Sequence, residues 1–240
     1  MTKLSINLNK IALLRNSRGR DFPNVVAFAK KFIALGVNGI TVHSREDERH
    51  ITRQDTVDLG KLLEGSAVEF NVEGYPSESF LELIEKVKPT QATLVPDAPD
   101  QLTSDHGWDL KKDGEFVKDV CAKITAFGVR TAIFLDPEVE QVKLAPLTGV
   151  ERIELYTETY ASSYDTTQHQ SVWEGFNEAS IEAQKLGLGV NAGHDLELLN
   201  LAKFLEIENI LEVSIGHVLT IECIEQGMNS VIEQYLKICK

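Results

Sequence analysis

Short runs of apolar and β-branched residues recur along the chain, and between them lie stretches whose apolar residues have helical spacing. Eight of the short runs indicate buried strands. The expected strands are residues 3–8, 39–43, 67–73, 91–96, 130–136, 152–157, 189–193 and 210–216. The expected helices are residues 23–36, 77–88, 136–145, 172–187, 195–206 and 218–237. This alternation predicts parallel strands joined by right-handed helical crossovers.

The number of strand–helix units in 240 residues predicts an α/β fold, a (β/α)8 TIM barrel with extra short helices, in one domain over residues 1–240. An open doubly wound sheet is the alternative. It would be expected to carry a glycine-rich phosphate loop after its first strand, and INLNKIALLRN has no GxGxxG pattern. The polar stretches 14–22 and 98–114 are expected to form lids or to carry extra short helices.

The composition is that of a globular protein with an acidic surface. Hydrophobic residues make up 42% of the chain and charged residues 25%, so a core of normal size needs neither disulfides nor metal. The net charge of −13 and the lack of a block rich in lysine and arginine argue against nucleic acid and anionic membranes as partners. A small phosphorylated substrate stays compatible, because a local basic cluster can oppose the global charge.

The cysteine pattern and the N-terminus indicate a cytoplasmic protein. Three scattered cysteines without a CxxC pair fit reduced thiols better than a disulfide framework. The first residues, MTKLSINLNK, lack the apolar region of a signal peptide. No apolar run approaches the ~18 residues of a membrane span, so we expect no membrane partner.

Titratable side chains stand where the predicted strands end. Active sites of such barrels lie at the C-terminal ends of the strands. Of the six histidines, His43, His194 and His217 stand directly at strand ends, and His50 follows in a loop. Glu73 ends the third strand. If the barrel forms, these side chains converge on one mouth, where they can transfer protons.

Each of these residues also has a structural interpretation. A histidine at one strand end can be a hydrogen-bonded core residue, and Glu73 can cap a neighbouring loop. Three histidines at three strand ends favour a functional site. Burying Glu154 without a partner costs several kcal/mol, so an inward-facing Glu154 would indicate function. We expect His106 and His169 to be surface residues, and from the run REDER we retain only Arg45.

Two Gly-His pairs indicate phosphate binding. Gly193 and Gly216 permit close approach of a ligand to the backbone, and a helix is expected to begin at each, in NAGHDL and SIGHVLT. The loops after the seventh and eighth strands of such barrels commonly hold phosphate. Arg18 and Arg45 can add bidentate contacts to a phosphate or carboxylate. The predicted site therefore combines phosphate anchors with a glutamate and histidines.

Seven segments together resemble the pyridoxine 5′-phosphate synthase family of vitamin B6 biosynthesis: INLNKIALLRNSRG, GITVHSREDERHI, FNVEGYPSE, TLVPD, RIELYTETYA, LGLGVNAGHDL and LEVSIGH. They occur in order from the first expected strand to the last. The resemblance implies a (β/α)8 barrel with extra helices that assembles as a homo-octamer. It also implies condensation of 3-amino-2-oxopropyl phosphate with 1-deoxy-D-xylulose 5-phosphate to pyridoxine 5′-phosphate, inorganic phosphate and water, without metal or organic cofactor.

The resemblance implies a role for each matching residue. His43 and Glu73 correspond to proton acceptors, His194 to a proton donor, and Glu154 to a carboxylate that stabilises a transition state. The positions implied to contact 1-deoxy-D-xylulose 5-phosphate are Asn9, Lys10, Arg45, His50 and Thr103. The positions implied to contact the aminoketone phosphate are Asn7, Arg18, Gly216 and His217.

The chain departs from the family pattern at three places. Many relatives have Asp-His where this chain has Asn9-Lys10, which affects the sugar phosphate contacts; we expect Lys10 to bind rather than to catalyse. Many have glycine at Asp195, which we place among the binding residues and which makes the phosphate site more acidic unless it caps a helix. Many have arginine near Glu222. None of these changes removes a proton-transfer residue.

Two other functions remain open on the same barrel. In a metal-dependent hydrolase, His43, Glu73, His194 and His217 would ligate zinc, although the paired-histidine motif usual at the end of the first strand is missing. A non-catalytic phosphosugar-binding protein would bind both phosphates without forming product. Metal analysis tests the first alternative, and turnover tests the second.

Overall fold

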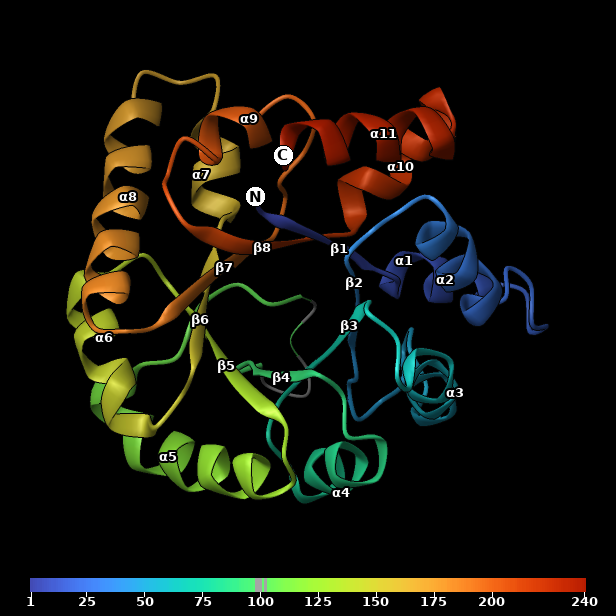
Figure 1. Cartoon of the computed structure of the whole chain (residues 1–240), viewed down its shortest axis with the longest axis horizontal. Coiled ribbons are helices and arrows are strands. Elements are labelled where there is room, and N and C mark those ends of the chain that lie inside the picture. The colour runs from blue at the N-terminus through green and yellow to red at the C-terminus, as the bar shows by residue number, and fades with distance from the viewer. Residues whose placement is uncertain (98–100, 102) are drawn as a thin grey trace.

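The computed structural model describes residues 1–97, 101 and 103–240 of the chain. Eight parallel strands close into a barrel in the order in which they occur in the sequence, with β8 beside β1 (Figure 1). The expected (β/α)8 barrel is therefore confirmed, and the open doubly wound sheet is wrong. The strands are β1 (Lys3–Asn7), β2 (Gly39–His43), β3 (Glu69–Gly74), β4 (Gln91–Leu94), β5 (Arg130–Leu135), β6 (Arg152–Tyr156), β7 (Gly189–Gly193) and β8 (Ile210–Ile215).

Each expected strand is present, with bounds that differ from the expected ones by no more than two residues. Successive side chains along a strand alternate between two surroundings. In β2, Ile40 and Val42 belong to the hydrophobic core, whereas Thr41 and His43 face the barrel interior. There the hydroxyl oxygens of Thr41 and Ser5 are 2.7 Å apart. The barrel interior is thus polar, and the apolar core lies between the strands and the helices.

A ring of helices surrounds the barrel (Figure 1). The ring covers the outer faces of the strands (Figure 1). The helices in the described residues are α1 (Asn9–Asn16), α2 (Val25–Ala34), α3 (Arg53–Leu63), α4 (Glu78–Val87), α5 (Leu110–Ala126), α6 (Val139–Leu144), α7 (Glu158–Ser163), α8 (His169–Lys185), α9 (Leu201–Phe204), α10 (His217–Gln226) and α11 (Met228–Ile238), with a 3-10 helix, η1, at Ala145–Thr148.

Four helices, α1, α3, α5 and α7, were not among those expected from apolar spacing. Local capping rather than apolar content begins α3: Thr52 accepts a hydrogen bond from the Asp55 amide, and Asp55 accepts one from the Thr52 amide. Two of these helices occupy parts of the polar stretches. Helix α1 extends into 14–22, and α5 begins within 98–114, whose residues 98–100 and 102 lie outside the described residues.

Two expected helices are wrong in extent. Only the short α9 forms within 195–206, because the Asn200 side chain replaces helical backbone contacts: it accepts from the Glu197 amide at 2.9 Å and donates to the Asp195 carbonyl at 3.2 Å. The expected helix 218–237 is two helices, α10 and α11, separated by Gly227. This glycine has φ 86°, a conformation that ends α10 at little steric cost.

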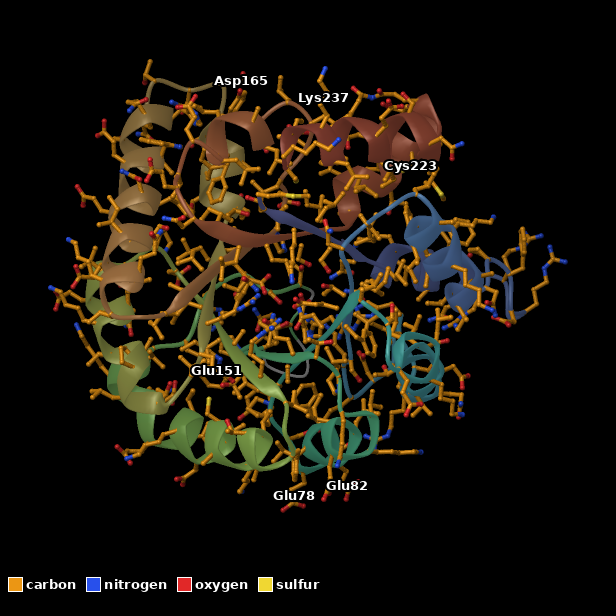
Figure 2. The ribbon with its side chains drawn as sticks, in the orientation of Figure 1. Glu78, Glu82, Glu151, Asp165, Cys223 and Lys237 are labelled. Carbon is orange, nitrogen blue, oxygen red and sulfur yellow. The ribbon has the colours of Figure 1, made fainter. Side chains whose placement is uncertain are left out.

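Aromatic rings from α7, α8 and α9 pack against one another in the core outside the barrel. Tyr160 packs edge-to-face on Phe204 with centroids 5.0 Å apart, and Phe176 packs on Phe204 at 5.7 Å. Charged side chains occupy the outer surface of the ring, as Figure 2 shows for Glu78 and Glu82 of α4. Burial of one face and charge on the other therefore fix how each helix lies on the barrel.

The three cysteines are free thiols, as their scattered positions predict; Cys121 and Cys239 are buried, and Cys223 is half-buried. In the described parts of the chain, no helix combines the length and the apolar character needed to cross a membrane.

Candidate active site

A cavity of about 510 Å³ lies at the C-terminal ends of the strands. Thirteen of the fourteen predicted catalytic and binding residues line it. Its size and its mixture of polar and apolar walls suit a small-molecule site. The predicted residues in its wall are Asn7, Asn9, Lys10, His43, Arg45, His50, Glu73, Thr103, Glu154, His194, Asp195, Gly216 and His217.

Arg18 is the predicted residue that does not line this cavity. It is exposed, and it lies in the segment between α1 and α2, which projects from the side of the barrel (Figure 1). Its contact with the aminoketone phosphate therefore stays a prediction that the geometry of this chain does not support.

His43, the last residue of β2, lies between two carboxylates and is only 6% exposed. Its Nδ1 is 3.8 Å from Glu73 Oε2, and its Nε2 is 3.8 Å from Asp97 Oδ2. Asn9 Oδ1 accepts a hydrogen bond from the His43 amide at 2.9 Å, which fixes the end of the strand. Burial, reinforced by the charge of Arg45, holds the pKa of His43 well below its usual value. The imidazole is therefore neutral at pH 7 and able to accept a proton.

Glu73 and Glu154 are buried carboxyls, 9% and 3% exposed, that face the same cavity. Burial, with the charge of Asp97, raises the pKa of Glu73 to about 8. Burial, with the charge of Glu73, raises the pKa of Glu154 well above its usual value. Among the described residues, no hydrogen-bond partner reaches Glu154 Oε2. Glu154 thus faces inward, the orientation that would indicate function, and Glu73 can hold and release a proton near neutral pH.

Asp97 is a site residue that the sequence did not identify. It is buried, and it pairs with Arg45 at 2.5 Å between Oδ2 and Nη2. It also accepts a hydrogen bond from Ser104 Oγ at 2.8 Å. Arg45 Nη1 donates to the Gln101 carbonyl at 3.0 Å. The guanidinium expected to bind phosphate is thus already paired with a carboxylate, and a phosphate would have to compete with Asp97.

The sequence contained a signal for Asp97. It directly follows the expected strand 91–96, just as Glu73 stands at the end of the third strand. Arg49 was also missed, because the run REDER was interpreted as a solvated loop. It lines the cavity and donates to the Gln101 carbonyl at 3.0 Å. Other lining residues that were not predicted as binding or catalytic are Leu13, Val95, Ser104, Phe134 and Ser214.

His50 is a neutral member of the cavity wall. Burial, with the charges of Arg45 and Lys10, lowers the pKa of His50 to about 4. Its Nδ1 accepts a hydrogen bond from the Ile51 amide at 2.9 Å, which places the ring proton on Nε2. His50 therefore offers a neutral N–H donor to a ligand, while Arg45, Lys10 and Arg49 supply the positive charges around it.

The end of β7 carries His194 and Asp195 in a tight turn. His194 Nδ1 is 3.0 Å from Asp195 Oδ2, and its Nε2 is 3.4 Å from Thr103 Oγ1. The imidazole packs edge-to-face on Tyr156 with centroids 5.0 Å apart. No helix begins here in the described chain, so the expected helix start at NAGHDL is wrong and Asp195 is not a helix cap.

The end of β8 has the expected helix start. Gly216 precedes α10, which begins at His217, and both residues line the cavity. A Cβ atom on Gly216 would lie 2.9 Å from the Cβ of Asn7, so a glycine lets β8 approach β1 closely. The first amide groups of α10 and the helix dipole favour an anion at this point.

Gly193 serves a similar purpose at the end of β7. A Cβ atom there would lie 2.5 Å from Glu154 Oε1. The glycine was expected to admit a ligand, but in the structure it makes room for the buried carboxyl of the neighbouring strand.

Glu222, the third departure from the family pattern, has a structural contact. It is nine-tenths buried, accepts a hydrogen bond from the Leu198 amide at 3.1 Å, and accepts another from the Tyr235 hydroxyl. It therefore joins the segment after β7 to α10 and α11.

Two remaining histidines differ from each other. His106 is exposed as expected and pairs with Asp105 at 2.5 Å. His169, also expected at the surface, is instead half-buried, with ring centroids 5.0 Å from Tyr160 and 4.7 Å from Tyr164. The surface expectation is therefore wrong for His169, because the turn between α7 and α8 places its ring on two tyrosines.

The residues suggested for a zinc site do not form one cluster. Across residues 1–97, 101 and 103–240, no group of three or more His, Cys, Asp or Glu side chains is placed to hold a metal ion. This geometry does not favour zinc ligation by His43, Glu73, His194 and His217. A smaller cavity of about 330 Å³ adjoins the larger one: His43 and Arg45 line both, and Asp97 lines the smaller one.

Comparisons with known proteins match nearly the whole chain. Residues 4–240 match the family described as pyridoxal phosphate biosynthesis protein PdxJ. A pyridoxine 5′-phosphate synthase of Bacteroides thetaiotaomicron is 50% identical over 236 residues, which are 98% of this chain and 98% of the relative. One from Christiangramia forsetii is 48% identical over 241 residues and covers 100% of both chains.

Among solved structures, a thiamine phosphate pyrophosphorylase from Pyrococcus furiosus is similar with a TM-score of 0.62 and 11% identity, covering 99% of this chain and 95% of that one. A phosphoribosyl anthranilate isomerase from Thermococcus kodakaraensis has a TM-score of 0.59 at 11% identity and covers 100% and 99%. At such identity these likenesses concern the barrel fold alone.

Proposed function

Because the chain belongs to the pyridoxal phosphate biosynthesis protein PdxJ family, we propose that its cavity condenses 3-amino-2-oxopropyl phosphate with 1-deoxy-D-xylulose 5-phosphate. The chain is an enzyme, a pyridoxine 5′-phosphate synthase like its named relatives. The products are pyridoxine 5′-phosphate, inorganic phosphate and water. The observation that carries the proposal is the set of thirteen predicted residues on one cavity.

The chemistry needs several proton transfers rather than one strong nucleophile. The amine of one substrate attacks the ketone of the other, and loss of water gives an imine. Loss of phosphate, ring closure and aromatisation each move further protons. Groups whose pKa lies near the working pH are the most effective general acids and bases. Glu73, whose pKa is raised to about 8, meets this requirement, and the neutral imidazole of His43, 3.8 Å away, has an unprotonated nitrogen that can accept a proton.

We assign the acid–base roles by position. His43 and Glu73 accept protons on the β2–β3 side of the cavity. His194 donates a proton from the opposite side, at the end of β7. Glu154, buried between them, stabilises positive charge that develops on the condensing nitrogen, because its ionised form is disfavoured until such a charge appears.

The phosphate contacts follow the two cationic or donor-rich parts of the wall. The aminoketone phosphate binds near Asn7 and the N-terminus of α10, at Gly216 and His217. The sugar phosphate binds near Lys10, His50 and Thr103. Asn9 and Arg45 complete the proposed contacts to the sugar phosphate, whereas Arg18, predicted for the aminoketone phosphate, does not line the cavity.

Three further properties accompany the proposal. Residues 1–240 act as a single barrel domain, which the pairing of β1 with β8 supports. The homo-octamer and the cytoplasmic location follow from the family resemblance and the sequence, and light scattering of the purified protein tests the octamer. The proposed reaction uses no metal or organic cofactor.

An assay with both substrates tests the function directly. Pyridoxine 5′-phosphate and inorganic phosphate should form together in equal amounts, and neither should form when either substrate is omitted. The His194→Ala variant should still bind both phosphates but form little product. Tight binding of both substrates by the unaltered chain without product would support the phosphosugar-binding alternative.

A further inference from the structure

Two consecutive residues at the end of β7, His194 and Asp195, have backbone conformations that side chains rarely adopt. Their φ values are 96° and 57°. The other non-glycine residues with positive φ in the described chain, Glu48, Lys88 and Asn209, stand singly. A glycine at either position would avoid the clash of Cβ with the backbone. Strained backbone conformations occur preferentially at active sites, where the side chains have a functional role.

The strained turn brings the two side chains together. His194 Nδ1 and Asp195 Oδ2 are 3.0 Å apart, a hydrogen bond between an imidazole N–H and a carboxylate. The hydrogen bond from His194 holds the pKa of Asp195 below its usual value, so the carboxylate is ionised at pH 7. The hydrogen bond from Nδ1 to Asp195 orients the ring, and its other nitrogen, Nε2, lies 3.4 Å from Thr103 Oγ1.

Backbone contacts on both sides hold the turn. The Thr157 hydroxyl donates to the His194 carbonyl at 2.5 Å, and the Asn200 side chain donates to the Asp195 carbonyl at 3.2 Å. Glu222 accepts from the Leu198 amide at 3.1 Å in the same segment. The turn is therefore kept by its surroundings, and the paired side chains are held in one arrangement.

The alternatives for Asp195 fit the geometry less well. It does not cap a helix, since α9 begins at Leu201 with Asn200 before it. As a direct phosphate ligand it would bring one anion against another. Its carboxylate already has a partner in the ring that the proposed function makes the proton donor.

We propose that Asp195 is a positioning residue, which holds the His194 imidazole with Nδ1–H on its carboxylate and Nε2 directed into the cavity for proton transfer. Paired in this way, the ring keeps one tautomer, and the carboxylate stabilises the doubly protonated imidazolium from which the proton leaves. The inference rests on the proposed function for the direction of proton transfer, but the pairing itself does not.

The test uses Asp195→Gly and Asp195→Asn. The glycine variant removes the carboxylate and relieves the strained φ. It should lower kcat by about 10- to 100-fold, less than the ~10²–10⁴-fold that loss of a general acid itself costs because His194 remains, without raising either KM and without lowering Tm. Asp195→Asn keeps an oxygen acceptor for Nδ1–H without the charge, so its kcat should lie between those of the glycine variant and the unaltered enzyme.

Lys88→Gly is the matched control. Lys88 is exposed, has φ 47° and ends α4, so this variant also relieves a left-handed residue, but away from the cavity. It should leave kcat unchanged. A fall in kcat for Lys88→Gly equal to that for Asp195→Gly would overturn the proposal, because it would show a general response to backbone change.

Nitrogen NMR of the imidazoles gives a readout that does not depend on turnover. In the unaltered enzyme His194 should hold its neutral-form proton on Nδ1, and in Asp195→Gly the Nε2–H form should increase. Unchanged tautomers together with unchanged kcat in Asp195→Gly would overturn the pairing. If the tautomer shifts but His194→Ala retains full kcat, the pairing stands and the role that the proposed function gives to His194 is wrong.

Discussion

Glu69 and Glu73 stand four residues apart on β3, at opposite ends of the barrel interior. Glu69 lies at the N-terminal end of the strands, here called the lower end, and Glu73 at the C-terminal end, the upper end. The pKa values of the two carboxyls are shifted in opposite directions. Glu69 pairs with Lys3 and with Arg130, and these contacts lower its pKa. Glu73 is more deeply buried, and burial raises its pKa to about 8. One strand thus carries a carboxylate that is ionised and paired with cations and a carboxyl that can exchange a proton near neutral pH.

A neutral layer separates the two carboxyls. Asn71 Oδ1 accepts from Thr93 Oγ1 at 2.9 Å and from Gln91 Nε2 at 3.2 Å. Arg130, the partner of Glu69, donates to Gln91 Oε1 at 2.9 Å. The cations at the lower end therefore remain bound to Glu69 and to this layer. For these two residues, cations contact the structural carboxylate, whereas the charges nearest the catalytic one that raise its pKa are those of Asp97 and Glu212.

The largest expected effect comes from removing the base at the upper end. Glu73→Gln keeps the size of the side chain and removes its basicity. We expect kcat to fall by about 10²–10⁴-fold, the usual contribution of general acid–base catalysis, with little change in substrate binding. Steady-state kinetics with both substrates measure this. Near-full turnover by Glu73→Gln would place Glu73 with Glu69 among the structural carboxylates.

Lysines extend the same contrast. Lys3 pairs with Glu69 at the lower end, whereas Lys10 lines the cavity. Lys10→Ala should raise KM for 1-deoxy-D-xylulose 5-phosphate by roughly 10- to 100-fold, because one charge-assisted hydrogen bond contributes about 1.5–3 kcal/mol. It should change kcat less and KM for the aminoketone phosphate little, and Lys10→His should recover much of the loss. Abolition of kcat at saturating substrate would show that Lys10 performs a catalytic step.

The contributions of Glu69 and Glu73 to the free energy of unfolding should depend on pH with opposite signs. Glu69, with a lowered pKa, stabilises the fold above its ordinary pKa, and that contribution is lost as pH falls through the folded value. Glu69→Gln should therefore cost about 1–3 kcal/mol at pH 7, mainly by leaving the Arg130 guanidinium without its carboxylate partner, and its difference from the unaltered protein should shrink in acid. Lys3 contributes less, because its side chain is 44% exposed.

Glu73 should show the opposite slope. Its raised pKa means that the folded state binds more protons than the unfolded state between pH ~4.5 and ~8. The protein therefore loses stability as pH rises through this window, and Glu73→Gln, which cannot ionise, should become relatively more stable. Thermal unfolding at pH 5 and pH 9 measures the difference for both variants. Parallel pH profiles for the two variants would contradict the comparison.

The smallest expected effect is that of a chelator. The site combines histidines with carboxyls, but we assign them to proton transfer. Incubation with EDTA followed by assay in metal-free buffer should leave kcat unchanged. Loss of activity that added zinc restores would overturn the assignment in favour of the metal-dependent alternative.

Much of the site could be predicted because it depends on strand ends. The apolar pattern located β2, β3 and β7, and the first polar residue after each strand falls at the mouth of a barrel by geometry alone. Helices were harder to predict. The α5 segment contains Gly114 and many charged residues, so its apolar spacing does not stand out in the sequence. Its buried residues, such as Val117 and Ile124, form an apolar face that is evident once the helix packs on the barrel.

The sequence by itself determined the eight strands, the closure into a barrel and the presence of His43, Glu73 and His194 at one end, because alternation and strand order act locally along the chain. The tertiary structure decided what surrounds these residues. Asp97 reaches Arg45 across 52 positions, and Thr103 reaches His194 across 91. The raised pKa of Glu73 and the strained turn at Asp195 likewise arise from burial and from contacts between distant segments, which no local pattern contains.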